Sequence, residues 1–236
     1  NDVVRWMYDA LYKMNVEVDF IEPSCKDMNR YQMVIVPALY AACEADLQRM
    51  KQYVADGGYL LTTFKTAYTD ENVKVYHDAF PHVLSECLGI SYSNFTFPKN
   101  VKLSGTADEQ AELFMELVKP EDADVLVSYD HYAWKDYAAV TRNHYGKGIA
   151  QYLGCKTSEK YLQKLLADAM KEAGIADTVQ NTEFPVIVRR MKDENGKTVW
   201  FYFNYSHTPA EAVYAGADGV YLMKEDQTFP GINVAA

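Results

Sequence analysis

The chain has 236 residues, of which 49% are hydrophobic and 24% are charged, and its formal net charge is −10. This composition excludes a disordered chain and leaves room for one large domain, or for a medium domain and a small one. The acidic balance argues against nucleic-acid partners, which bind surfaces rich in Lys and Arg. No apolar run approaches the roughly 20 residues of a membrane span, so we expect no membrane partner.

The four cysteines are far apart in the sequence, at Cys25, Cys43, Cys87 and Cys155. No C-x-x-C pair occurs and no histidine stands at metal-ligand spacing, so the pattern predicts neither a zinc site nor a disulfide framework. We expect no metal and no cofactor, and a reduced cytoplasmic protein.

The first predicted element is an amphipathic helix over residues 2–11, whose apolar side chains recur at helical spacing. Residues 16–20 alternate between apolar and acidic side chains, which predicts a strand. A doubly wound sheet normally begins with a strand that lies centrally, ahead of the first helix. We expect this opening strand to lie upstream of Asn1.

Residues 31–64 give the clearest pattern in the chain. The apolar, β-branched run 33–36 predicts a buried strand, and apolar residues at helical spacing over 47–54 predict a helix. Gly57 and Gly58 end that helix, and a second apolar run follows at 59–64. The stretch predicts two parallel strands joined by a right-handed crossover.

The polar segment 65–80 predicts a long loop that functions in binding or contacts a partner. A short helix over 83–88, closed by Gly89, and an edge strand over 90–97 follow. Thr106 and Glu109 have the spacing of a capping box, which predicts a helix through residues 111–118. The remaining expected elements are a strand at 125–129, a hairpin of strands 138–141 and 149–153, and a helix capped by Ser158 and ended by Gly174.

The pattern changes near residue 184. Strands at 186–191 and 199–205 flank Asn195-Gly196, a strong hairpin signal, and no helix is predicted after them. The sequence therefore predicts an α/β domain over residues 1–178 and part of a small all-β, sandwich-like domain over 184–236.

An open α/β sheet of this kind directs attention to the turn after Phe64, where amidotransferase-like domains carry a Cys in a G-x-C-x-G elbow. The turn here reads Lys65-Thr66-Ala67, so no thiolate is present to form an acyl-enzyme. No GxSxG motif occurs. The triplet 146–148, Gly-Lys-Gly, precedes a strand and lacks the Ser or Thr of a phosphate loop, so it predicts a hairpin turn.

The histidines, paired carboxylates and tyrosines are weaker candidates for functional residues. His131, His144 and His207 could serve as acids or bases, but isolated surface histidines are commoner. The carboxylate pairs at 70–71 and 193–194 are expected to be solvated loop charges, because no pair is placed for glycosidase chemistry. The 19 tyrosines could form a sugar-stacking surface or an interface, although packing is the safer expectation for each. We predict no catalytic, cofactor-binding or metal-binding residue.

Several segments together resemble glycoside hydrolase family 42 β-galactosidases. The resemblance to their trimerisation domain rests on YDALYKMNVEVDFIEP (8–23), YQMVIVPALY (31–40), YVADGGYLLTTF (53–64), TDENVKV (69–75) and AAVTRNHYGKGIAQYLG (138–154). VIVRRMKDENGKTVWFYFNYS (186–206) resembles the start of the C-terminal β-domain of the same enzymes.

The resemblance implies a three-layer, flavodoxin-like domain of the class I glutamine amidotransferase-like type without the amidotransferase residues. It implies a homotrimeric parent enzyme that removes terminal β-galactose in carbohydrate metabolism, with both catalytic glutamates and the β-galactoside site on an upstream barrel. The chain itself is then a non-catalytic assembly module. Two alternatives stay open, an active amidotransferase-like hydrolase and a carbohydrate-binding module.

Overall fold

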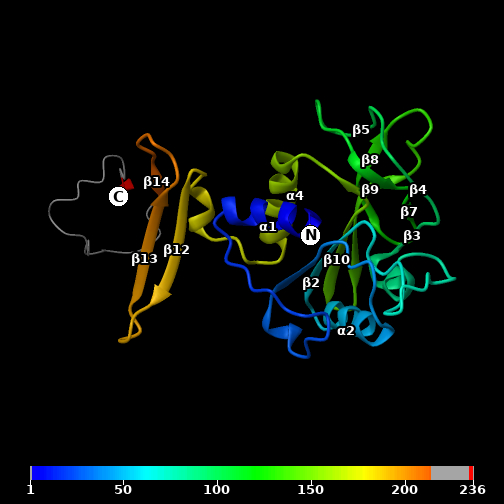
Figure 1. Ribbon diagram of the computed structural model, residues 1–236, viewed down its shortest axis with the longest axis horizontal. Helices are drawn as coiled ribbons and strands as arrows, with labels where there is room; N and C mark the ends of the chain where they lie inside the picture. The colour runs from blue at the N-terminus through cyan, green and yellow to red at the C-terminus, as the bar shows by residue number, and fades with distance from the viewer. Residues whose placement is uncertain (1, 214–233, 236) are drawn as a thin grey trace.

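The computed structural model describes residues 2–213 and 234–235 (Figure 1). The helices in this part of the chain are α1 (Asp2–Lys13), α2 (Glu44–Ala55), α3 (Ser85–Leu88) and α4 (Glu159–Glu172), with 3-10 turns at Met28–Arg30, His82–Leu84 and Thr178–Asn181. The main sheet has the spatial order β1 (Met33–Val36), β2 (Tyr59–Thr63), β10 (Gly148–Leu153), β9 (Ala138–Tyr145), β8 (Asp124–Asp130) and β5 (Lys102–Leu103).

The other sheets have two or three strands each. One contains β11 (Cys155–Lys156), β6 (Glu112–Glu116) and β4 (Phe95–Thr96), and another pairs β3 (Ile90–Ser91) with β7 (Lys119–Pro120). The others are the hairpin of β12 (Val186–Lys192) and β13 (Thr198–Asn204), and the pair β14 (Ala212–Val213) and β15 (Val234–Ala235).

The predicted crossover is confirmed. Strand β1 lies parallel to β2, with Met33 opposite Tyr59, and β2 lies parallel to β10. The turn into β10 approaches the end of α2 closely, because a Cβ on Gly148 would lie 2.3 Å from the carbonyl oxygen of Val54. Glycine is therefore required there so that β10 can enter the sheet beside β2.

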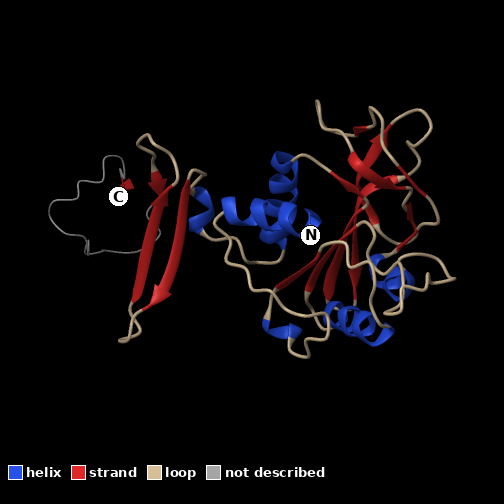
Figure 2. Cartoon of the chain, viewed as in Figure 1, coloured by secondary structure: helices blue, strands red, loops and turns tan. Residues whose placement is uncertain are grey.

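Helices cover both faces of the sheet. One core cluster joins α1 and α4 to the sheet through Met7, Leu11 and Leu166, and a second joins α2 to the other face through Leu47 and Met50. The mixed α/β class predicted from the sequence is confirmed at this level. In Figures 1 and 2, α1 and α4 lie between the main sheet and the β12–β13 hairpin.

Tyrosine contributes much of this core. Five tyrosines are almost completely buried: Tyr53, Tyr59, Tyr92, Tyr129 and Tyr152. Their hydroxyls lie near polar groups of the interior; that of Tyr53, for example, donates to the carbonyl oxygen of Tyr31 at 2.9 Å. For these five side chains the expected packing role is confirmed.

The predicted strand at residues 16–20 is wrong. These residues pair with no strand, and β1 is the end strand of its sheet in the described part of the chain. Alternation of apolar and acidic residues indicates an extended backbone, but a strand also needs a neighbour with which to exchange hydrogen bonds.

The predicted helix over 111–118 is also wrong. Residues 112–116 form β6, which pairs with β4 and β11. The capping box does not form, because the Thr106 hydroxyl donates to the carbonyl oxygen of Leu103 at 2.7 Å and Glu109 instead contacts Ser158 at the start of α4. Long-range pairing has overridden a local helical signal.

The single edge strand predicted over 90–97 is divided. Residues 90–91 belong to β3 and residues 95–96 to β4, which lie in different sheets. Between them, the Tyr92 N–H donates to the carbonyl oxygen of Phe80 at 3.0 Å. The loop 65–80 therefore lies against this segment.

The remaining predicted helices and hairpins are confirmed, including the α4 cap at Ser158. The predicted helix over 83–88 ends at Gly89 with φ 63°, but its first two residues belong to the 3-10 turn His82–Leu84 and only α3 is α-helical. The β12–β13 hairpin contacts the first domain through Asn15, which is buried. Its side-chain amide donates to the carbonyl oxygens of Thr182 and Val186, and its Oδ1 accepts from the Val188 N–H at 2.7 Å. The boundaries at 178 and 184 stay predictions, and most of the segment after residue 213 lies outside the described residues.

Candidate functional site at the end of strand β2

The turn after β2 has an uncommon backbone conformation. Lys65 and Ala67 both have positive φ, 64° and 56°, a region that costs a residue with a Cβ about 1–2 kcal/mol. Two contacts stabilise the turn: the Thr66 hydroxyl donates to the carbonyl oxygen of Thr63 at 2.7 Å, and the Lys65 N–H donates to Glu116 Oε1 at 2.9 Å. The strained turn is thus anchored to a buried carboxyl.

Glu116 is that carboxyl, and it is fully buried at the end of β6. Its second oxygen accepts a 2.6 Å hydrogen bond from the hydroxyl of Tyr152 on β10. Burial raises the pKa of Glu116 to about 7, although the hydrogen bonds from Tyr152 and from the Lys65 N–H oppose this rise. A carboxyl whose pKa lies near 7 is typical of acid–base sites, and it also occurs where a buried carboxyl serves only as a structural hydrogen-bond acceptor.

The Lys65 ammonium is surrounded by aromatic rings. Its Nζ lies 3.7 Å from the ring centre of Phe95, 4.4 Å from that of Tyr68 and 4.7 Å from that of Phe114. Burial lowers the pKa of Lys65, and the nearby charge of Glu116 partly offsets this change. The rings stabilise the cation through their negative faces. The side chain that follows β2 and Phe64 is therefore a lysine enclosed by aromatic rings.

This arrangement can exchange a proton, but it offers no thiol for acyl transfer. The four cysteines lie elsewhere and are free, and burial raises the pKa of both Cys87 and Cys155 to about 12. A thiol with so high a pKa is unreactive near neutral pH. Cys25 and Cys43 are partly buried.

The other residues considered from the sequence are not brought together. His131 accepts from the Ala133 N–H at 3.2 Å within its own loop, and His144 and His207 are exposed. Asp70 and Asp193 each accept backbone N–H groups of their own turns, as expected of loop carboxylates. No group of three His, Cys, Asp or Glu side chains suited to a metal ion occurs in residues 2–213 or 234–235.

Sequence reasoning missed Glu116. The signal was a lone carboxylate inside the apolar run Phe114-Met115-Glu116-Leu117. A buried carboxylate needs donors, and its donors come from β10 and from the turn after β2, which are distant in sequence.

An apolar surface adjoins the turn. Ring contacts run from Tyr40 to Tyr68 (5.2 Å) and from Phe95 and Phe97 to Phe114 (5.0 and 6.3 Å). Several of its side chains are exposed: Tyr40, Phe95, Phe97 and Leu113. We call these four residues, with Val73 and Val75 of the 65–80 loop, the aromatic surface. Phe97 is 74% exposed and Val73 is 64% exposed.

A family model described as the β-galactosidase trimerisation domain matches residues 1–176. The chain belongs to this family. The chain is 32% identical over 247 residues to the β-galactosidase BgaB of Geobacillus sp. (strain Y412MC61), with 99% of this chain and 36% of that protein covered. The β-galactosidase LacZ of Heyndrickxia coagulans is also 32% identical, over 91% of this chain and 32% of its own length.

Solved structures of β-galactosidases are also similar to this chain. The crystal structure of a β-galactosidase from Bacillus circulans sp. alkalophilus is similar with a TM-score of 0.78 and 27% identity, over 86% of this chain and 31% of that one. The cold-adapted enzyme of Rahnella sp. R3 gives a TM-score of 0.79 at 25% identity, over 86% of this chain and 32% of that one. The chain thus spans about a third of the length of these relatives. No helix in its described part is long and apolar enough to cross a membrane.

Proposed function

We propose that this trimerisation domain acts as a non-catalytic assembly module of a longer β-galactosidase, and that it associates three copies of the parent enzyme. The observation that carries the proposal is the replacement of an elbow nucleophile by Lys65, which lies among aromatic rings next to an exposed apolar surface. The parent would hydrolyse terminal β-galactose by a retaining mechanism, with two carboxyl groups that lie outside this chain.

The aromatic surface is our proposed contact between copies. It includes Val73 and Val75 of the 65–80 loop, which the sequence predicts to contact a partner, and its Phe, Tyr, Leu and Val side chains are all exposed. Aromatic anchors of this kind dominate the energy of protein interfaces. Lys65 supports the surface from beneath, because its ammonium packs on Phe95 and Phe114.

Light scattering tests the proposal. We expect the purified chain to give three times the mass of one chain, and Phe97→Asp with Leu113→Asp to give the mass of a monomer. Met191→Asp is the matched control, because Met191 is 57% exposed but lies on the β12–β13 hairpin. A chain that is monomeric at every concentration, or a control that dissociates equally, would contradict the proposed interface.

An activity assay tests the non-catalytic role. The chain alone should release no nitrophenol from a nitrophenyl β-galactoside, and measurable turnover would show that the chemistry lies within it. The amidotransferase alternative would require glutaminase activity that disappears when one cysteine is replaced. The carbohydrate-binding alternative would require saturable binding of millimolar galactoside, and the burial of Tyr53, Tyr59 and Tyr152 removes three candidate stacking residues.

The finer fold assignment is also a proposal. A flavodoxin-like, amidotransferase-like core is supported by the parallel strands β1, β2 and β10, by helices on both faces, and by the strained turn at Lys65. A cytoplasmic location is supported by the four free cysteines.

A further inference from the structure

Four aromatic rings surround the ammonium group of Lys65, and we call them the aromatic cage. The distance from Nζ to the ring centre is 3.7 Å for Phe95, 4.4 Å for Tyr68, 4.7 Å for Phe114 and 5.9 Å for Tyr40. All four distances lie within the range of about 6 Å over which a ring face attracts a cation. Phe114 is buried, whereas Tyr40 and Phe95 are 39% and 42% exposed, so the cage is open to solvent on one side.

Further ring contacts hold the cage in place. Tyr68 stacks on Phe80, with ring centres 4.5 Å apart and 12° between the ring planes. Phe114 packs against Phe64 with ring centres 5.5 Å apart. Because these contacts do not involve Lys65, the rings keep their positions when the lysine side chain moves away. The cage is therefore formed before a ligand binds, which lowers the cost of binding.

The Lys65 ammonium leaves part of its bonding capacity unused in this cage. An ammonium group carries three N–H donors, and aromatic rings offer no oxygen to accept them. Within the described residues, Nζ makes no hydrogen bond or ion pair with a protein group, whereas Lys13, Lys51 and Lys156 each form an ion pair with a glutamate. A cation that has no N–H group can occupy the same rings without leaving a donor unpaired.

The charge near the cage also favours a cation. Burial lowers the pKa of Lys65, and the charge of Glu116 opposes this change, so the carboxyl lies within electrostatic range of the cage. Glu116 is itself fully buried, and the whole chain has a formal net charge of −10. The surroundings of the cage therefore attract a positive ligand and repel an anion.

We propose that the aromatic cage binds small quaternary ammonium compounds, the chemical class to which choline belongs, and that Lys65 competes for the same site. The N-methyl groups of the ligand pack on the rings, and its charge replaces that of the ammonium, which moves into solvent. The Lys65 backbone stays in place because its N–H donates to Glu116. The inference does not rest on the proposed trimer.

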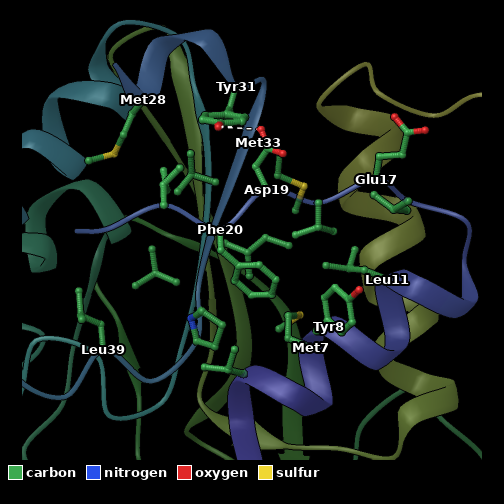
Figure 3. Close-up of a pocket in the computed structure, with 18 of the residues that line it drawn as sticks. Met7, Tyr8, Leu11, Glu17, Asp19, Phe20, Met28, Tyr31, Met33 and Leu39 are labelled. Atoms are coloured by element: carbon green, nitrogen blue, oxygen red, sulfur yellow. Dashed lines mark hydrogen bonds between the residues drawn. The ribbon is translucent and has the colours of Figure 1, made fainter. Parts of the chain in front are cut away.

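A small cation could also enter an apolar pocket of about 550 Å³ beside β1, which the experiment has to separate from the cage (Figure 3). Its lining includes the carboxylates of Glu17 and Asp19 and the ring of Phe20. Phe20→Leu removes the ring from this pocket, and Phe95→Leu removes the ring nearest to Nζ of Lys65. The two variants are therefore matched controls for each other.

Titration with choline chloride at constant ionic strength, followed by the NMR line width of the choline methyl protons, measures binding. We expect Lys65→Ala to raise the affinity about tenfold, because the competing ammonium is removed. Lys99→Ala removes the same charge from an exposed residue and should leave the affinity unchanged. Lys65→Gly is a second variant, since glycine adopts the positive φ freely, and circular dichroism checks that each variant is folded.

In the Lys65→Ala chain, Phe95→Leu should weaken choline binding about tenfold and Phe20→Leu should leave it unchanged. The uncharged isostere of choline, in which carbon replaces nitrogen, should bind more weakly than choline. Equal affinity of the wild type and both Lys65 variants would overturn the proposal. Equal binding of the isostere, or a loss of binding with Phe20→Leu instead of Phe95→Leu, would overturn it too. Light scattering on the same samples follows assembly separately.

Discussion

Glu116 links the chemistry of one residue to the stability of the domain. Its pKa is about 7 in the folded state, against a usual value of 4.5. Between these pH values the folded state keeps a proton that the unfolded chain releases, so the free energy of unfolding falls as pH rises through this window and is constant above it. The difference corresponds to at most about 3 kcal/mol.

We therefore expect Glu116→Gln to remove this fall. Gln still offers an oxygen to the Lys65 N–H, but it cannot ionise. Urea unfolding at pH 5 and pH 7.5 measures the effect, and the wild-type loss of stability across this interval should exceed that of the variant by about 2 kcal/mol. A variant with the same pH dependence as the wild type would show that Glu116 ionises normally in the fold.

For single residues, the sequence predicted a role only where the neighbouring residues in the chain determine that role. The absence of a nucleophile at Lys65 could be read from the turn, because an elbow needs a Cys or Ser at one position. The role of Glu116 could not, because its donors come from β10 and from the turn after β2. The aromatic surroundings of Lys65 likewise come from Tyr68, Phe95 and Phe114, which only the fold brings together.

Helix α4 begins at a cap shared between two distant segments. The Ser158 hydroxyl accepts from the Tyr161 N–H and donates to Glu109 at 2.7 Å, and the Ser158 N–H donates to the other oxygen of Glu109 at 2.7 Å. We expect Ser158→Ala to lower the free energy of unfolding by about 1–2 kcal/mol, since it removes the cap and leaves Glu109 with one donor.

Urea denaturation measures this loss, with Ser93→Ala as the control because Ser93 is exposed and caps no helix. Ser158→Asp should be worse than Ser158→Ala, because a second carboxylate would face Glu109, although Asp is ordinarily a good cap. A Ser158→Asp variant as stable as the wild type would contradict the shared cap.

Asn15 connects the segment after α1 to the β12–β13 hairpin by hydrogen bonds. It has φ 59° and makes three hydrogen bonds to residues 182–188, all in a buried position. Asn15→Ala should weaken the packing of the hairpin by about 2–3 kcal/mol, because it leaves two carbonyls and one N–H without partners. Hydrogen exchange should then rise in β12 and stay unchanged in β2.

Asn15→Gly separates the two causes of this loss. Glycine adopts the positive φ freely but makes no side-chain hydrogen bond, so it should weaken the hairpin nearly as much as alanine does. A glycine variant that behaves like the wild type would mean that backbone conformation, and not the hydrogen bonds, accounts for the effect of Ala.

Elements with local signals were predicted well. In the β1–α2–β2 crossover, the β9–β10 hairpin and α4, the hydrophobic periodicity and the residues that end each element lie within one short stretch of sequence. Strand β6 was not predicted, because five residues cannot show that their partners are β4 and β11. Residues 16–20 show the converse, since their alternation fits a strand while no partner lies beside them in the described chain.

For the whole molecule, charge opposes association while the aromatic surface favours it. Each chain carries a formal net charge of −10, so copies that approach one another repel. We expect the proposed trimer to strengthen as NaCl is raised from about 0.02 to 0.5 M, because the screening length falls to a few ångströms. Sedimentation velocity at several salt concentrations measures this. Weaker association at high salt would indicate an interface stabilised by ion pairs and not by the aromatic surface.

The ultraviolet absorbance of the buried tyrosines reports whether the domain is folded. Burial raises the pKa of Tyr53 to about 12 and also raises the pKa values of Tyr59, Tyr129 and Tyr152, so these phenols keep their protons in the folded state above pH 10. Because the unfolded chain would ionise all of them near pH 10, stability falls as pH rises above that value. Tyrosinate absorbance should therefore increase in two phases. The second should coincide with the loss of helical circular dichroism, so that one alkaline titration reports both the surface and the core.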